Sequence, residues 1–156
     1  MQINKKVMAN DVQNVQMRLL SLKEVSFMMS PGKMPDDANP ESVKLGFSNQ
    51  THPDVKKDVI NLVFGVKYEL AGDTILESIY SFMFEIKGLD RFVIINGANM
   101  TIAHIMPHLL SVACGTMRGI LVVKTAGTSF SKFPLPMIDP NQLSACLSSA
   151  QSTGNS

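Results

Sequence analysis

Cysteine and net charge are both scarce in this chain of 156 residues. The two cysteines, Cys114 and Cys146, lie far apart without a CxxC pair, which excludes a zinc ribbon or disulfide framework and favours a reducing compartment. Fourteen Lys and Arg residues against thirteen Asp and Glu residues leave a formal charge of +1. The chain therefore has no basic field for nucleic acid, and nucleic-acid binding is not expected.

Targeting and membrane-spanning segments are also missing from the sequence pattern. The first residues lack the long apolar core and the small-residue cleavage site of a secretory signal, which predicts a cytoplasmic protein. Residues 92–117 carry no Asp, Glu, Lys or Arg and are long enough to cross a bilayer. Pro107, His104, His108 and two asparagines in this stretch would be costly in lipid. We therefore expect buried soluble structure there and no membrane insertion.

No catalytic or metal-binding set can be assembled from the motifs. His104 and His108 have the i, i+4 spacing of a helical metal site, with Cys114 or His52 as a third ligand. Pro107 between the two histidines should begin a new helix and turn their rings apart. Cys114 has no fixed base or orienting group nearby in the pattern, so it is interpreted as a buried apolar thiol. We expect no enzyme, no metal and no cofactor.

The first half of the chain shows the period-two alternation of β-strands. Apolar and polar residues alternate over 15–27, 42–49, 59–70 and 74–87. In the first of these strands the phase slips at Leu20, which indicates a bulge. A turn at 71–73 joins the last two strands as an antiparallel hairpin.

The second half reads as helices around one irregular segment. The pattern predicts a short helix over 99–105, a longer one over 107–124 with Pro107 in its first turn, and a C-terminal helix over 141–149. The three prolines of FPLPMIDP, 133–140, exclude regular helix and central strand, so this should be an extended crossing segment. Strands first and helices second define the α+β class. We expect an N-terminal extension (1–14), a single domain (15–147) and a flexible tail (148–156).

Apolar residues occupy both faces of the strand predicted over 74–87. Phe82 and Phe84 lie on one face and Ile79 and Met83 on the other. One domain of this size rarely covers both faces of a sheet, which implies a subunit interface or binding surface unless a helix packs on each side. Together with 11 methionines and the Pro-rich crossing segment, this favours a groove for extended or unfolded peptide. A closed pocket for a lipid or another small hydrophobic ligand is the alternative.

Five segments, in this order and spacing, resemble the SecB family of bacterial export chaperones. They are LKEVSF (22–27), PESVKLGF (40–47), FMFEIKGLDRFVI (82–94), MTIAHIMPHLL (100–110) and FPLPMID (133–139). The resemblance implies a four-stranded antiparallel sheet with a short helix, a long helix and a C-terminal helix, assembled as a dimer of dimers.

The function that the resemblance implies is an ATP-independent holdase. Such a protein captures unfolded or precursor polypeptides in long apolar grooves and passes them to the SecA motor. Binding the unfolded state slows both folding and aggregation by mass action. A SecB-like chaperone of a toxin–antitoxin system, whose client is an antitoxin, is the alternative within the resemblance.

The resemblance also suggests site residues. Candidate client contacts, for which simple core packing is the alternative, are Phe27, Met29, Val43, Leu45, Phe47, Phe130 and Phe133. Candidate SecA-docking residues are Glu24, Met83 and Glu85.

Overall fold

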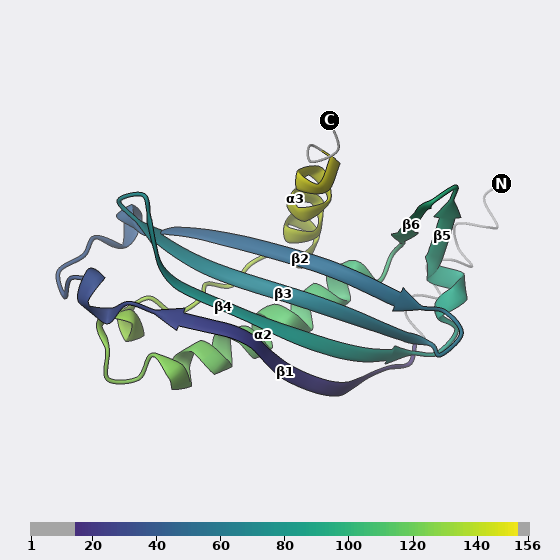
Figure 1. The fold of residues 1–156 in the computed structure, drawn as a ribbon, viewed down its shortest axis with the longest axis horizontal. Coiled ribbons are helices and arrows are strands. Elements are labelled where there is room, and N and C mark those ends of the chain that lie inside the picture. Colours follow the sequence, from purple (N-terminus) through teal and green to yellow (C-terminus); the bar gives the residue numbers. More distant parts are fainter. Residues whose placement is uncertain (1–14, 153–156) are drawn as a thin grey trace.

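A four-stranded antiparallel sheet with one long helix across one face forms the body of the molecule (Figure 1). The computed structural model describes residues 15–152. The sheet has the order β1-β4-β3-β2 and contains β1 (Met17–Met29), β2 (Lys44–Asp54), β3 (Val59–Leu70) and β4 (Asp73–Ile86). The remaining elements are β5 (Val93–Asn96), β6 (Asn99–Ile102), α2 (Met106–Lys124) and α3 (Pro140–Ser152). The α+β class and the four-stranded antiparallel sheet are therefore confirmed.

The core lies between the sheet and α2. Even-numbered residues of the two central strands point to this inner face, and Leu62, Phe64 and Phe82 are fully buried there. From α2, Leu110, Ala113 and Met117 are buried against them. Each such large apolar side chain contributes about 1.5–3 kcal/mol on leaving water. The period-two alternation that predicted the strands is thus the pattern of a sheet covered on one face.

Strand β1 is bulged, as the phase slip predicts. Its register against β4 shifts between Leu19 and Ser21 and again between Glu24 and Ser26. These shifts leave Leu20 and Val25 without partners across the ladder. Both side chains are exposed, at 43% and 56%.

The prediction of a short helix over 99–105 is wrong, because this region forms a second, two-stranded sheet. Val93 pairs with Ile102 and Asn96 with Asn99, so two residues make the loop. Gly97 in that loop has a φ of 64°, which glycine adopts without steric cost. β-Branched residues flank this loop, and a glycine at its first position is a hairpin signal.

The boundaries of the other elements agree closely with the sequence pattern. Helix α2 has Pro107 in its first turn, and the crossing segment is irregular over residues 133–139, up to the start of α3. Strand β2 extends five residues past its predicted end at position 49, through Pro53, which an edge strand tolerates. Helix α3 runs to position 152, into the predicted tail, while residues 1–14 and 153–156 lie outside the described residues.

By length and composition, α2 is the one helix of the described part that could cross a membrane. In this structure one side of α2 packs on the sheet, and this packing by itself accounts for an apolar helix.

Candidate functional site

An apolar groove of about 320 Å³ lies between the edge strand β2 and the crossing segment. We call it the β2 groove, and it is lined by Pro40, Val43, Leu45, Tyr68, Lys132, Phe133, Pro134 and Pro136. The lining contains one cation and no acidic residue. The groove is open to solvent rather than enclosed, as a site for a chain segment is.

The floor of the β2 groove follows from the pairing of β2 with β3. Leu45 lies opposite Tyr68, and directly opposed residues of an antiparallel pair share one face. Both side chains therefore point to the inner face. Val43 enters the groove just before β2, after a short turn whose start is capped by Asn39, with its Oδ1 accepting from the Glu41 N–H at 3.0 Å.

The other wall, the crossing segment, is held by side chains from β3 and α2. The Tyr68 hydroxyl donates to the Phe133 carbonyl at 2.8 Å. Arg118 on α2 donates from Nε to the Leu135 carbonyl at 2.8 Å and from Nη2 to the Pro136 carbonyl at 3.0 Å. Proline has no N–H, so this segment cannot form a regular ladder and its carbonyls need such donors.

Burial fixes the protonation state of the Tyr68 hydroxyl. Desolvation raises the pKa of Tyr68 to about 12, so the hydroxyl stays protonated across the physiological range. It is therefore a permanent donor to the crossing segment.

A second, smaller space lies on the other side of the crossing segment. We call it the α2 pocket; it measures about 50 Å³ and is lined by Tyr68, Leu121, Val122, Thr125, Ser131, Phe133 and Pro134. Tyr68, Phe133 and Pro134 border both spaces.

The β2 groove also runs beside a free sheet edge. Strand β2 pairs with β3 on one side, and nothing in the described part of the chain pairs with its other side. An edge strand offers outward N–H and C=O groups to an additional strand. Apolar pockets beside such an edge are the combination that extended peptides use for binding.

The structure brings some of the predicted client residues together and separates the rest. Val43, Leu45 and Phe133 line the β2 groove. Phe47 follows on the same inner face of β2, partly buried, with its ring 6.2 Å from the ring of Phe64. Phe130 is only 1% exposed, so its place is the core.

Phe27 and Met29 lie at the opposite edge of the sheet, on β1. Both are partly buried against the core, and the Lys124 ammonium stands 4.3 Å above the ring of Phe27. They are not part of the β2 groove.

The three predicted SecA-docking residues do not lie on one surface. Glu24 is opposite Tyr80 on the inner face, where its carboxylate accepts from the Tyr80 hydroxyl at 3.1 Å and pairs with Lys124. Met83 and Glu85 lie on the outer face, which α2 does not cover, and Glu85 pairs with Arg18 at 3.3 Å. The hydrogen bond from Lys124 lowers the pKa of Glu24.

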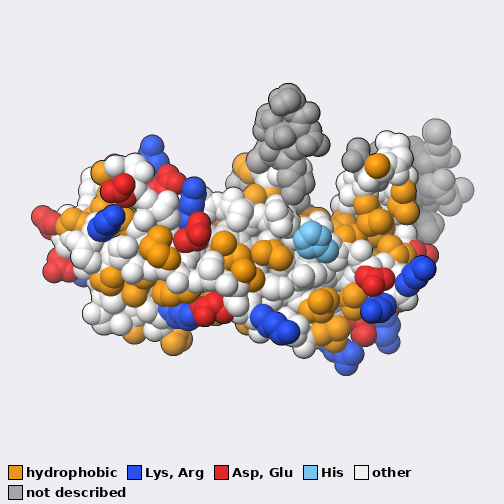
Figure 2. All heavy atoms as spheres, in the orientation of Figure 1, with side chains coloured by type: hydrophobic (Ala, Val, Ile, Leu, Met, Phe, Trp, Pro, Cys, Tyr) orange, Lys and Arg blue, Asp and Glu red, His pale blue; other side chains and the backbone are white. Residues whose placement is uncertain are grey.

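The outer face of the sheet is mixed in character. Ile79 and Met83 do point there, as the alternation of β4 predicts, but β2 and β3 place Ser48, Gly65 and Asn61 beside them. Viewed from this side, acidic and basic side chains alternate with scattered apolar ones (Figure 2). No helix of the described part covers this face (Figure 1).

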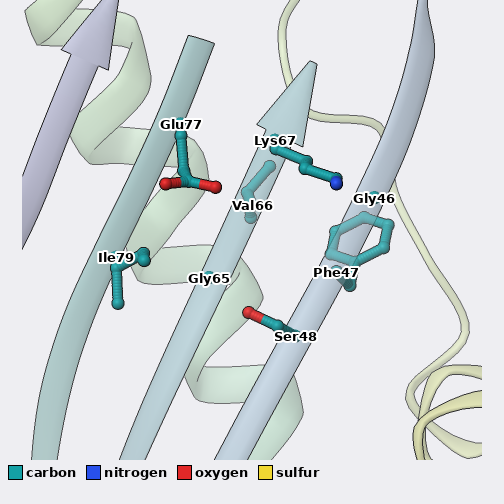
Figure 3. A pocket seen from close by; sticks show the side chains of 8 residues that line it. All are labelled: Gly46, Phe47, Ser48, Gly65, Val66, Lys67, Glu77 and Ile79. Atoms are coloured by element: carbon teal, nitrogen blue, oxygen red, sulfur yellow. The ribbon is translucent and has the colours of Figure 1, made fainter. Parts of the chain in front are cut away.

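A hollow of about 210 Å³ marks the outer face where two glycines leave space. Gly46 and Gly65 form its floor, with Lys67, Glu77 and Ile79 around it (Figure 3). A Cβ atom on Gly65 would stand 2.5 Å from the Ser48 hydroxyl oxygen, so the serine side chain would have to rotate to admit another residue there. The rim combines one cation, one acid and one apolar side chain, which selects no single ligand chemistry.

Among residues 15–152, no group of three metal-ligating side chains is found. Burial raises the pKa of the Cys114 thiol, which keeps it protonated and unreactive. Cys146 is exposed on α3.

Sequence reasoning missed several residues of the site. Tyr68, Lys132 and Arg118 were not among the candidates, although Pro134 and Pro136 fall within the Pro-rich segment that was singled out. Tyr68 and Arg118 contribute through hydrogen bonds to residues that lie 65 and 17 positions away in the chain. No local pattern reports such contacts.

No protein-family model matches this chain, and no curated protein matches it. Among solved structures, the chain is similar to a SecB-like chaperone of Mycobacterium tuberculosis in complex with a ChAD peptide from the HigA1 antitoxin. That alignment has 8% identity, covers 89% of this chain and 94% of the other, and has a TM-score of 0.40. A protein of unknown function from Streptococcus agalactiae has 12% identity over 80% and 97% of the two chains, with a TM-score of 0.33. At these TM-scores neither structure assigns an activity or a site to this chain.

Proposed function

We propose that this protein is an ATP-independent holdase chaperone of the cytoplasm that binds non-native polypeptides as extended segments in the β2 groove. The observation that carries the proposal is an open apolar groove at the start of an unpaired edge strand. Main-chain hydrogen bonds to β2 would supply affinity without sequence readout, and the pockets around Leu45 and Phe133 would take apolar side chains. The SecB resemblance of the sequence supports the same function.

The shape of the groove favours a polypeptide over a small hydrophobic ligand. Pockets for small molecules enclose most of the ligand surface, whereas the β2 groove stays open to solvent. A chaperone of this kind needs no nucleotide, because binding the unfolded state is enough to slow aggregation.

We further propose that the protein assembles as a homo-oligomer, a dimer of dimers. Supporting this, β1 forms the second edge of the sheet and carries an unusual number of exposed apolar side chains. They are Met17, Leu19, Leu20, Leu22, Val25 and Met28, each between 38% and 56% exposed. A long edge strand with this composition is an association surface.

The clients are proposed to be precursor polypeptides or an antitoxin. For precursors, transfer to SecA would use Met83 and Glu85 on the open outer face, with Glu24 contributing from the inner side of β1. An antitoxin client would need no transfer to SecA, so binding in the β2 groove would be enough.

Suppression of aggregation by the purified full chain tests the function. We expect the protein to reduce light scattering from a chemically unfolded model protein without ATP. Leu45→Asp should weaken this activity by about tenfold or more, because a charge in an apolar pocket must be desolvated on binding. Leu45 is 37% exposed, so the substitution should leave the fold intact.

Gln50→Asp is the matched control for this experiment. It adds the same charge to the same strand, but on the exposed outer face. Equal activity of the two variants, or no activity in the unaltered protein, would contradict the proposal.

A further inference from the structure

The two apolar spaces beside the crossing segment share one wall. Phe133 and Pro134 border the β2 groove on one side and the α2 pocket on the other, and Tyr68 lies under both. If these two residues moved, the spaces of about 320 Å³ and 50 Å³ would join into one apolar channel between β2 and α2.

The wall and the rest of the crossing segment are held by different groups. Downstream, the guanidinium of Arg118 holds two successive carbonyls, those of Leu135 and Pro136, and Leu135 is 2% exposed. At the wall, the Phe133 N–H donates to the carbonyl of the buried Phe130 at 2.9 Å, and the Phe133 carbonyl has one side-chain partner, the Tyr68 hydroxyl. Pro134 has no N–H and can donate no bond of its own. The Phe133 side chain is only partly buried, whereas Leu135 anchors the core.

We propose that Phe133 and Pro134 form a movable divider, held closed by the Tyr68 hydroxyl, which an apolar side chain of the bound polypeptide displaces. This inference rests on the proposed function of the β2 groove and adds how the groove adapts to different side chains. In the closed state the divider separates two pockets. In the open state the bond from the Tyr68 hydroxyl is broken, the Phe133 N–H keeps its bond to the Phe130 carbonyl, and the client side chain takes over the apolar contacts of Phe133. Arg118 keeps the remainder of the segment in place, so the movement stays local.

Removing the Tyr68 hydroxyl tests whether Phe133 and Pro134 form a movable divider or a fixed wall. Tyr68→Phe deletes the bond that holds the divider and leaves the ring in place. The probe is a fluorescein-labelled, unstructured peptide in which leucine alternates with serine and lysine, and binding is measured by anisotropy. We expect Tyr68→Phe to bind it about fivefold more tightly, the factor for one ordinary hydrogen bond that no longer has to be broken. Tyr80→Phe is the matched control, because it deletes the hydroxyl of the chain's other tyrosine, at the β1 edge, and should bind like the unaltered protein.

Fluorine NMR of the otherwise unaltered protein gives a second readout, which reports where the peptide binds. Labelling with 3-fluorotyrosine yields two signals, for Tyr68 and Tyr80, which the two Phe variants assign. Peptide should shift the Tyr68 signal and leave that of Tyr80 in place. If peptide binds the unaltered protein but Tyr68→Phe binds it no more tightly, the divider is overturned while the groove remains a peptide site. If no form of the protein binds the peptide, the proposed function falls and the divider falls with it.

Discussion

The Lys124 side chain joins the last turn of α2 to the edge strand β1. Its ammonium stands over the ring of Phe27 and pairs with the carboxylate of Glu24, which also accepts from the Tyr80 hydroxyl. The hydrogen bond to Glu24 raises the pKa of Lys124, and the same bond lowers the pKa of Glu24. The side chains of Lys124 and Glu24 are 32% and 42% exposed, so solvent screens the pair and its contribution to stability is modest.

This ion pair predicts a pH-dependent contribution to stability. Because the pKa of Glu24 is lower in the folded state, its stabilisation is complete above the unfolded value, about 4.3, and is lost as the pH falls through the folded value. We expect Glu24→Gln to lower the midpoint of thermal unfolding at pH 7. At pH 3 the difference should shrink, because the unfolded state then binds a proton at Glu24 and folding with the carboxylate ionised has to release it. Glu41→Gln, on the exposed turn before β2, is the control and should leave the unfolding midpoint unchanged. If Glu24→Gln lowers the midpoint equally at both pH values, the ion pair is not the source of the loss.

The loop that joins β3 to β4 contains a residue poorly suited to its backbone conformation. Leu70 pairs with Asp73, so Ala71 and Gly72 alone make the loop, with φ values of 52° and 84°. Two positive φ angles are the geometry of a type I′ turn, which favours Asn-Gly. In the left-handed region an alanine costs about 1 kcal/mol.

Replacing this alanine should therefore stabilise the hairpin. We expect Ala71→Asn to raise the free energy of unfolding by about 0.5–1 kcal/mol in urea denaturation. Ala126→Asn, in the turn after α2 where the alanine φ is not positive, should bring no gain. A neutral or destabilising Ala71→Asn would show that the turn relaxes to accept alanine.

The hairpin of β5 and β6 shows why an element can be misread from its sequence. Ile102 and Ile105 have the i, i+3 spacing of one helix face, and the proline that follows at 107 suits a helix start. The β-branched residues on both sides of Asn96 and Gly97 favour strands instead. Pairing of Val93 with Ile102 decides between the two, and that pairing spans nine positions.

Assembly belongs to the scale of the whole molecule, since β1 has exposed apolar side chains that no other element of the described residues covers. We expect light scattering of the purified protein to give the mass of a tetramer. Val25→Lys, at a bulge where the side chain is 56% exposed and no ladder partner is lost, should reduce that mass by placing charges in the proposed β1 interface. Gln50→Lys on β2 should leave it unchanged. A monomeric unaltered protein would overturn the proposed assembly.

The sequence by itself determined the elements whose pattern is local. The alternation of residues 59–70 placed β3, the turn at 71–73 placed the hairpin, and Pro107 placed the start of α2, because each depends on neighbours within a few positions. The slip at Leu20 located a bulge for the same reason.

Only the tertiary structure decided which of these residues meet. The β2 groove joins Val43, Tyr68 and Phe133, which are distant in the chain, and alternation alone cannot say which sheet face α2 will cover. For the same reason, the sequence pattern could not show that Glu24 and Glu85 lie on opposite faces of the sheet. A groove is built from long-range contacts, and long-range contacts are fixed by how layers pack rather than by the local order of residues.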